Sequence, residues 1–227
     1  METIDTIEYK GYTINIHPDT EPYNPREGED LGTMICWHRN YSLGEDHTFS
    51  TPDDFMEWVK SHGKNGIIYL PLFLYDHSGI SMSTRSFIGR AHHAEWDSGQ
   101  VGWIYITRDK IKKEYGWKYL TKARRDKIIQ YLKNEVETYD HYLTGYVYGY
   151  TIEDPEGNEI DASCWGYFGD PSGYMAEDAK MEVDADIRHR QEEEKKNRHS
   201  HWKRLRGYII NKVPLQYRER YTPIYIN

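Results

Sequence analysis

The stretch from about Ser172 to Lys212 limits most strongly what this chain can fold into, because it is highly charged and carries few apolar side chains. Helical propensity without packing is marginal in water, so a helix of this composition must dock through one narrow stripe and expose the rest. We predict a long solvated helix from about 174 to 212, ended by Pro214. The expected stripe comprises Met181, Val183, Ile187, Trp202, Leu205, Ile209 and Ile210.

The second half of this helix carries the only concentrated positive patch in the sequence, and two interpretations of it stay open. Cations suit the C-terminal end of a helix dipole, so they can simply form a solvated face. They can also contact an acidic partner, whether protein or nucleic acid, and Lys203, Arg204 and Arg206 are our candidate binding residues. The whole patch comprises Lys195, Lys196, Arg198, Lys203, Arg204 and Arg206.

The part of the chain before this helix has the pattern of an α+β domain. We predict a core domain over residues 1–170 and a charged helical C-terminal extension over residues 171–227. The core is expected to hold one mainly antiparallel sheet packed by two or three helices. Its strands are predicted near 5–16, 31–38, 66–83, 100–106, 146–153 and 159–167, and its main helices near 52–62 and 121–142.

Local signals place the helices of this core. Thr51 has the side chain of an N-cap and Gly63 is a stop signal, which together bound a short helix. Thr107 and Gly116 bound a second short helix in the same way. Thr121 begins a longer helix with apolar residues at helical spacing. The stretch "STRSFIGRAHHAEWDSG" has no clear period, and we expect a loop there.

Composition and charge exclude several classes of protein. The chain has 29 Lys and Arg against 37 Asp and Glu, a formal charge of -8, so no general phosphate-binding field is expected. It has two cysteines, no secretion signal and no apolar run of membrane-spanning length. We therefore expect no membrane association and the reducing cytoplasm of a host cell. Twenty-one Tyr and 7 Trp against 5 Phe suit a half-exposed sheet or a binding surface.

The segment "YDHSG" places Asp76, His77 and Ser78 at the polar end of an apolar strand. A Ser-His-Asp triad requires each residue to reach the next, but neighbours in an extended strand point to opposite faces. These three residues therefore cannot form a triad by themselves. Catalysis would require another segment to converge on them.

The segment "WDSGQ" is the candidate for that second segment. If its strand pairs with the first one, Asp97, Ser98 and Gln100 should gather with Asp76 and His77 at one rim of the sheet. The same residues also make ordinary turns, because Asp and Ser side chains bond nearby backbone amides. We keep three interpretations: turn formation, a binding site, and catalysis by Asp76, His77 and Asp97. The candidate binding residues are Ser78, Trp96, Ser98, Gln100 and His38.

Motifs for metals and cofactors do not occur in the sequence. It has no His-Glu-x-x-His or Cys-x-x-Cys spacing, and no glycine-rich phosphate loop. Cys36 and Cys164 lie in apolar, strand-like segments, where a thiol behaves as a small hydrophobe. We therefore predict neither a metal site nor a cofactor.

Several phrases together resemble a family of proteins carried by bacteriophages and other mobile elements. They are "NPREGEDLGTMICWHRNYSLGEDH", "IYLPLFLYDHSGISMS", "WDSGQVGWIYITRDKIKKEYG", "VETYDHYLTGYVYGY" and "CWGYFGD". The resemblance covers about residues 5 to 170 and leaves the charged extension outside. It implies an origin and brings no activity with it.

This resemblance favours a phage-type accessory protein that binds and inhibits or modulates a host factor. An anti-defence role, against CRISPR or restriction, is its specific form. The expected partner is a host protein or a protein–nucleic acid complex, and homo-oligomerisation stays open. The alternative is a small hydrolase or nucleotide-binding enzyme that uses Asp76, His77 and Asp97. We favour the binding protein over the enzyme, because Tyr and Trp give contact area at low entropic cost.

Overall fold

The computed structural model describes residues 2–28, 30–63, 66–218 and 220, and it confirms the α+β class. In this part of the chain the strands form two four-stranded antiparallel sheets. The elements in order are β1 (Asp5–Tyr9), β2 (Tyr12–Pro18), the 3-10 helix η1 (Pro25–Glu27), β3 (Thr33–Cys36), α1 (Pro52–Ser61), β4 (Ile67–Asp76), β5 (Ile80–Ser83), α2 (Ala94–Asp97), β6 (Ser98–Thr107), α3 (Arg108–Tyr115), α4 (Lys122–Thr144), β7 (Val147–Glu153), β8 (Cys164–Phe168) and α5 (Tyr174–Lys212).

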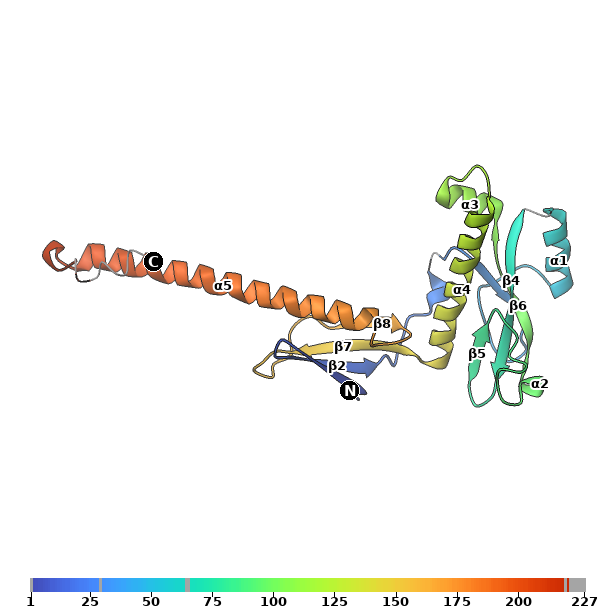
Figure 1. Ribbon diagram of the computed structural model, residues 1–227, viewed down its shortest axis with the longest axis horizontal. Helices are drawn as coiled ribbons and strands as arrows, with labels where there is room; N and C mark the ends of the chain where they lie inside the picture. Colours follow the sequence, from blue (N-terminus) through green and yellow to red (C-terminus); the bar gives the residue numbers. More distant parts are fainter. Residues whose placement is uncertain (1, 29, 64–65, 219, 221–227) are drawn as a thin grey trace.

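The division into two sheets corrects the expectation of a single one. We call the sheet with the order β3-β6-β4-β5 the head sheet, and the sheet with the order β1-β2-β7-β8 the arm sheet. Helix α4 lies between them (Figure 1). Its end at Gly145 is followed by β7, which pairs with β2 instead of with a head strand. Each sheet has its own apolar cluster, so the chain builds two cores where periodicity alone suggested one.

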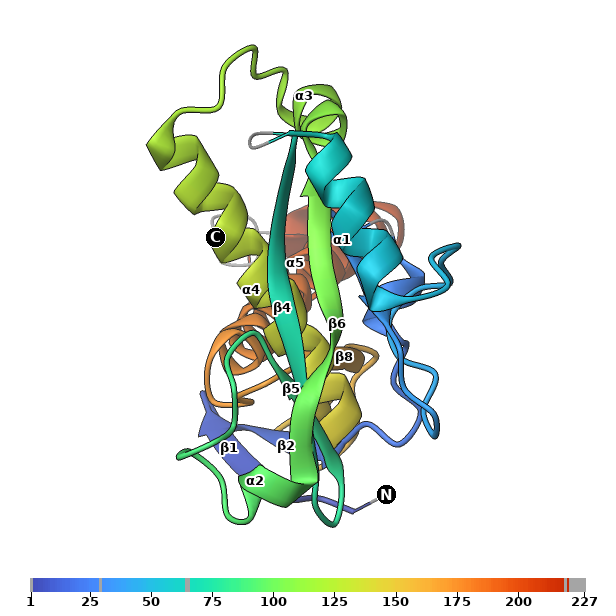
Figure 2. The same cartoon turned by 90° about the vertical axis from the view of Figure 1, so that its right-hand side faces the viewer.

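The head sheet is covered by a helix on each face (Figure 2). Alternation along β6 explains this, because successive side chains point to opposite faces. Ile104 and Ile106 are buried in the cluster that includes residues of α4. Trp103 and Tyr105 point the other way and pack on Phe55 of α1, with ring centroids 5.1 and 5.3 Å from its ring. The head is therefore a closed three-layer unit.

The helix signals predicted from the sequence are confirmed. Thr51 and Asp54 form a reciprocal capping box at the start of α1. Thr107 caps α3 and Thr121 caps α4, each through its side-chain oxygen. The predicted apolar stripe of α4 consists of Ile128, Ile129, Leu132, Val136 and Tyr139, and all of these except the half-buried Ile129 are buried. The loop expected over residues 83–99 differs in part, because the end of β5, the short helix α2 and the start of β6 lie within it.

Helix α5 is the predicted long helix, and its first part packs on the arm sheet. The packing stripe is Met175, Ala179, Val183 and Ile187, at intervals of four residues. The predicted stripe was wrong at Met181, Trp202 and Ile210, which are 57%, 38% and 45% exposed. Beyond Arg190 the helix extends away from the rest of the molecule (Figure 1). The residues after 170 thus provide part of one core and also a projecting arm.

Tyrosine hydroxyls and α5 carboxylates join the arm sheet to this helix. The Tyr12 hydroxyl donates to Asp186 over 2.7 Å, and the Tyr150 hydroxyl donates to Asp178 over 3.2 Å. The Tyr167 hydroxyl also bonds Asp178. Burial, with the bond to Asp186, raises the pKa of Tyr12 to about 12. Part of the tyrosine excess in the sequence therefore serves this internal interface.

Candidate functional site

The predicted rim exists at one end of the head sheet. Strands β4 and β6 pair so that Tyr75 lies opposite Ser98, which brings the "YDHSG" and "WDSGQ" segments together. The turn from β4 to β5 and the helix α2 lie at this same end (Figure 2). Helix α3 follows β6 at the opposite end. The rim is thus built from a hairpin turn and a short helix at the end of a rigid sheet.

His77 and Asp97 form the central pair of the rim. The Nδ1 atom of His77 lies 2.7 Å from Oδ2 of Asp97. The two side chains are 44% and 31% exposed, so the pair lies at the surface. Among the described residues, none bonds the Nε2 atom of His77. A carboxylate that holds Nδ1 fixes the ring orientation and leaves Nε2 for a partner or substrate.

The other catalytic candidate, Asp76, has a different partner. Its Oδ1 atom accepts a hydrogen bond from the Tyr41 hydroxyl at 3.3 Å. His38, one of the binding candidates, stacks on the Tyr41 ring with centroids 5.0 Å apart, so His38 lies beside the rim. His38 and Tyr41 also line a cavity of about 440 Å³. Asp76 therefore connects the rim to the loop after β3 and does not join the His77–Asp97 pair.

Two of the three hydroxyl and amide candidates, Ser98 and Gln100, bond nearby backbone carbonyls. Ser98 Oγ donates to the carbonyl of Ala94 over 2.6 Å, and Gln100 Nε2 donates to the carbonyl of Gly102 over 3.4 Å. Ser78 lies in the turn between β4 and β5. No described serine thus bonds His77, and the structure assembles an oriented imidazole without a nucleophilic hydroxyl.

Trp96 lies beside this pair on α2 and is 87% exposed. Two histidines that the sequence analysis did not select, His92 and His93, lie within ring-contact distance of His77, with centroids 6.5 and 6.1 Å away. The Tyr75 hydroxyl bonds the carbonyl of His92 over 2.9 Å and fixes this loop to the sheet. The run "HHAEW" was the available signal, but its nearness to His77 depends on the tertiary fold.

The backbone around the pair is strained. Ser78 has a φ of 59° and His93 has a φ of 54°, in the left-handed region that residues with a Cβ rarely adopt. Such conformations cost on the order of 1–3 kcal/mol each and persist where the surrounding structure imposes them. Both residues flank the rim, so its shape is maintained against a local preference of the chain.

The basic candidates lie far from this rim. Lys203, Arg204 and Arg206 are exposed side chains near the distal end of α5. Figure 1 shows α2 and the distal part of α5 at opposite ends of the molecule. The structure therefore separates the predicted binding residues into two surfaces.

Sequence reasoning also missed a buried ionic cluster around Arg26. This side chain is 2% exposed and pairs with Glu45, with Glu135 at 3.2 Å and with Asp30 at 3.2 Å. It also donates to the carbonyl of Gly32 over 2.8 Å. Ion pairing raises its pKa despite its burial, while burial raises the pKa of Glu135. No motif around "NPRE" predicts that Arg26 forms a buried ion-pair cluster.

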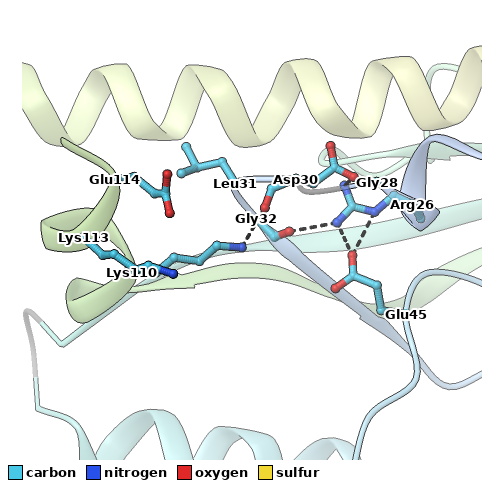
Figure 3. A pocket seen from close by; sticks show the side chains of 9 residues that line it. All are labelled: Arg26, Gly28, Asp30, Leu31, Gly32, Glu45, Lys110, Lys113 and Glu114. Carbon is cyan, nitrogen blue, oxygen red and sulfur yellow. Dashed lines mark hydrogen bonds and ion pairs between the residues drawn. The ribbon is translucent and has the colours of Figure 1, made fainter.

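A cavity of about 410 Å³ adjoins the cluster (Figure 3). The guanidinium group is turned to Glu45 and to the backbone of Gly32, and Lys110 Nζ bonds the carbonyl of Asp30 over 2.6 Å. The Arg26 guanidinium at the base of the cavity is thus already paired with protein groups. We interpret the cluster as a structural junction between the loop before β3 and helix α4.

Two further observations concern metals and membranes. Within residues 2–28, 30–63, 66–218 and 220, no group of three or more His, Cys, Asp and Glu side chains could hold a metal ion. The helices in the same residues include none with the length and apolar character needed to cross a bilayer.

Comparison with protein-family models, curated proteins and solved structures gives no match to this chain.

Proposed function

We propose that this protein binds a host protein through the rim of the head sheet. The binding surface, which we call the Trp96 surface, consists of Tyr75, His77, His92, His93, Trp96 and Asp97. The observation that carries the proposal is the exposure of Trp96, at 87%, on a short helix beside an ordered His–Asp pair. Tryptophan contributes large binding energies at protein interfaces when a partner buries it.

The setting of Trp96 supports this proposal. An indole that is 87% exposed contributes little to folding, because the gain of about 25 cal/mol per Å² requires apolar surface to be buried. Here it follows His93, whose strained backbone begins α2, and it precedes the first residue of β6. A rigid anchor loses little conformational entropy when it binds. The His77–Asp97 pair then supplies polar contacts beside the apolar anchor.

The kind of partner is proposed from the resemblance to proteins of bacteriophages and mobile elements. Such proteins act on host machinery, so we propose that binding inhibits or modulates a host factor. An anti-defence role, against CRISPR or restriction, is the specific form of this proposal. The Trp96 surface supplies a mode of binding that does not depend on which host factor is the target.

One observation favours a second candidate function. The contact between His77 and Asp97 is the arrangement that orients a general base, and no described residue bonds the Nε2 atom. An enzyme of this kind would use the imidazole to activate water, because Ser98 and Tyr75 donate their hydroxyls to backbone carbonyls. A small hydrolase or nucleotide-binding enzyme is therefore the alternative. Asp76 would then act only through Tyr41.

The test compares two variants with the unmodified chain for partner capture from a host lysate. Trp96→Ala should reduce recovery of a stoichiometric partner at least about tenfold, which corresponds to about 1.4 kcal/mol. Tyr119→Ala is the matched control, because Tyr119 is exposed in the connection from α3 to α4, and α3 lies at the end of the head opposite α2 (Figure 2). It should leave recovery unchanged. Equal recovery by both variants would contradict the proposed surface.

The enzyme alternative is tested with His77→Gln and Asp97→Asn on a panel of nucleotides and esters. Turnover by the unmodified chain that both variants abolish, together with capture that Trp96→Ala does not change, would replace the binding proposal with the enzyme. Absence of turnover, with capture lost in Trp96→Ala, supports the binding protein.

A further inference from the structure

The distal half of α5 concentrates positive charge in one exposed helical segment. Between residues 195 and 218 the sequence contains no Asp or Glu. Over residues 195–212 it contains seven basic side chains, and they are exposed. These are Lys195, Lys196, Arg198, Lys203, Arg204, Arg206 and Lys212. We call this segment the basic arm.

The fold separates this charge from an acidic body. Outside residues 195–212, the chain has 22 of its 29 Lys and Arg and all 37 of its Asp and Glu, so the remainder of the chain is acidic. Arg190 is the last α5 residue with a bond to the loop after β7, through Asp154. At about 1.5 Å per residue, Lys203 lies about 20 Å farther along the helix. This exceeds the Debye length of about 8–10 Å at physiological salt, so the charge of the residues before Arg190 is largely screened at Lys203. Screening is weaker at the start of the arm, where Lys196 Nζ lies 3.7 Å from Oε1 of Glu193.

The distribution of cations around the helix indicates the shape of the partner. With 3.6 residues per turn, Lys195, Lys203 and Arg206 share one face. Arg198, Arg204 and Lys212 lie on other sides of the same cylinder. A flat acidic surface would contact only one of these faces. A nucleic-acid groove surrounds an inserted helix with phosphates on both sides, and the major groove of B-DNA is about 12 Å wide, which admits a helix.

We propose that the basic arm binds duplex DNA along its phosphate backbone. The arm forms a rod of about 27 Å, and duplex DNA presents one charge per about 1.7 Å of its axis. The whole-chain charge of -8 disfavours phosphate binding by the molecule in general. The local charge of the basic arm is positive, and this local charge governs binding there. This surface is separate from the Trp96 surface, so one chain can contact a host protein and the DNA beside it.

The experiment measures binding of the full chain to a fluorescent, mixed-sequence DNA duplex over a series of salt concentrations. The triple variant Lys203→Gln, Arg204→Gln and Arg206→Gln should weaken binding more than about tenfold and reduce the magnitude of the salt slope by up to about 3. Glutamine has a helix propensity close to those of Lys and Arg, so α5 should keep its helical circular dichroism. That spectrum is recorded for each variant.

The matched control is Lys112→Gln, Lys118→Gln and Lys122→Gln, which removes the same charge from exposed positions of the head. It should leave affinity and slope close to those of the unmodified chain. Equal losses in the two triple variants would contradict the proposal, because net charge alone would then explain binding. Trp96→Ala should bind DNA normally, so the two proposals can fail independently.

Two other occupants of the arm, an acidic polypeptide and a second copy of the chain, are tested by adding a competition and a light-scattering measurement. Poly-glutamate that displaces the duplex at equal charge concentration would show that the arm selects no nucleic acid, and it would overturn the proposal. A salt-sensitive dimer in light scattering, without DNA binding, would show that the acidic stretch near Glu193 on a second copy occupies the arm. That result would also overturn it.

Discussion

The head sheet and the arm sheet are both four-stranded and antiparallel, but the chain stabilises them in different ways. The head sheet is enclosed on both faces, by α4 and by the aromatic layer of α1. The arm sheet has one face on α5 and a polar opposite face, where Asn15 bonds Glu153 over 3.0 Å and His17 bonds Thr151 over 3.0 Å. Apolar burial dominates in the head, whereas the arm sheet adds hydroxyl–carboxylate bonds to a narrow apolar stripe.

This difference indicates how each region can serve a function. A closed core gives the head a rigid end on which a strained turn and an exposed indole can persist. The one-sided arm sheet instead anchors the first part of α5 and leaves the cations of its distal half exposed. The molecule therefore presents one surface on a rigid support and another on a projecting helix.

The largest predicted contrast concerns one arginine in each region. Arg26→Ala should destabilise the protein by about 3–5 kcal/mol, because it leaves the partly buried carboxylates of Glu45 and Glu135 without the buried cation that pairs with them. Arg190→Ala should cost less, because its side chain is 41% exposed and Asp154, although only 7% exposed, still accepts hydrogen bonds from the backbone N–H groups of Glu156 and Asn158. Urea unfolding of both variants measures the difference. Similar losses would refute the contrast between the two regions.

A smaller effect should appear at alkaline pH, and it should involve the arm sheet. The pKa of Tyr12 is raised from 10.0 to about 12, so the folded state favours the neutral phenol. Its contribution to stability is complete below about pH 10 and is lost as the pH rises through about 12. The melting temperature should therefore fall over this range, and less so in Tyr12→Phe. An identical alkaline profile for that variant would exclude Tyr12 as the cause.

The smallest predicted effect is that of the rim on stability. Trp96→Ala should change the free energy of unfolding by no more than about 0.5 kcal/mol, since the indole is 87% exposed. Thermal unfolding beside the unmodified chain measures this value. A loss of several kcal/mol would show that Trp96 is a structural residue, and the binding proposal would lose its main support.

The elements with local signals could be predicted from the sequence. The cap at Thr51, the apolar stripe of α4 and the extent of α5 all follow from neighbouring residues. The division into two sheets could not be predicted, because alternation shows that a strand has a buried face but not which strand covers its edge. The bond between Tyr12 and Asp186 joins residues far apart in the sequence, and no local pattern encodes it.

The candidate site was predictable in its location but not in its details. The repeated Asp-Ser-Gly and Asp-His-Ser-Gly phrases predicted a shared rim, and the pairing of Tyr75 with Ser98 brings them together. The contact of His77 with Asp97 and the exposure of Trp96 depend on how α2 packs after its loop. Arg26 gave no signal, because a single arginine in a loop of Pro, Gly and Asp resembles a solvated residue.

Hydrogen exchange along α5 tests the central claim, that this helix is anchored over its first part and projects freely beyond it. Amides over residues 175–187 should exchange slowly, because this segment packs on the arm sheet. Amides over residues 195–212 should exchange much faster in the isolated protein and become protected when duplex DNA is added. Equal protection of both segments without any partner would contradict the account, because the basic arm would then already be covered.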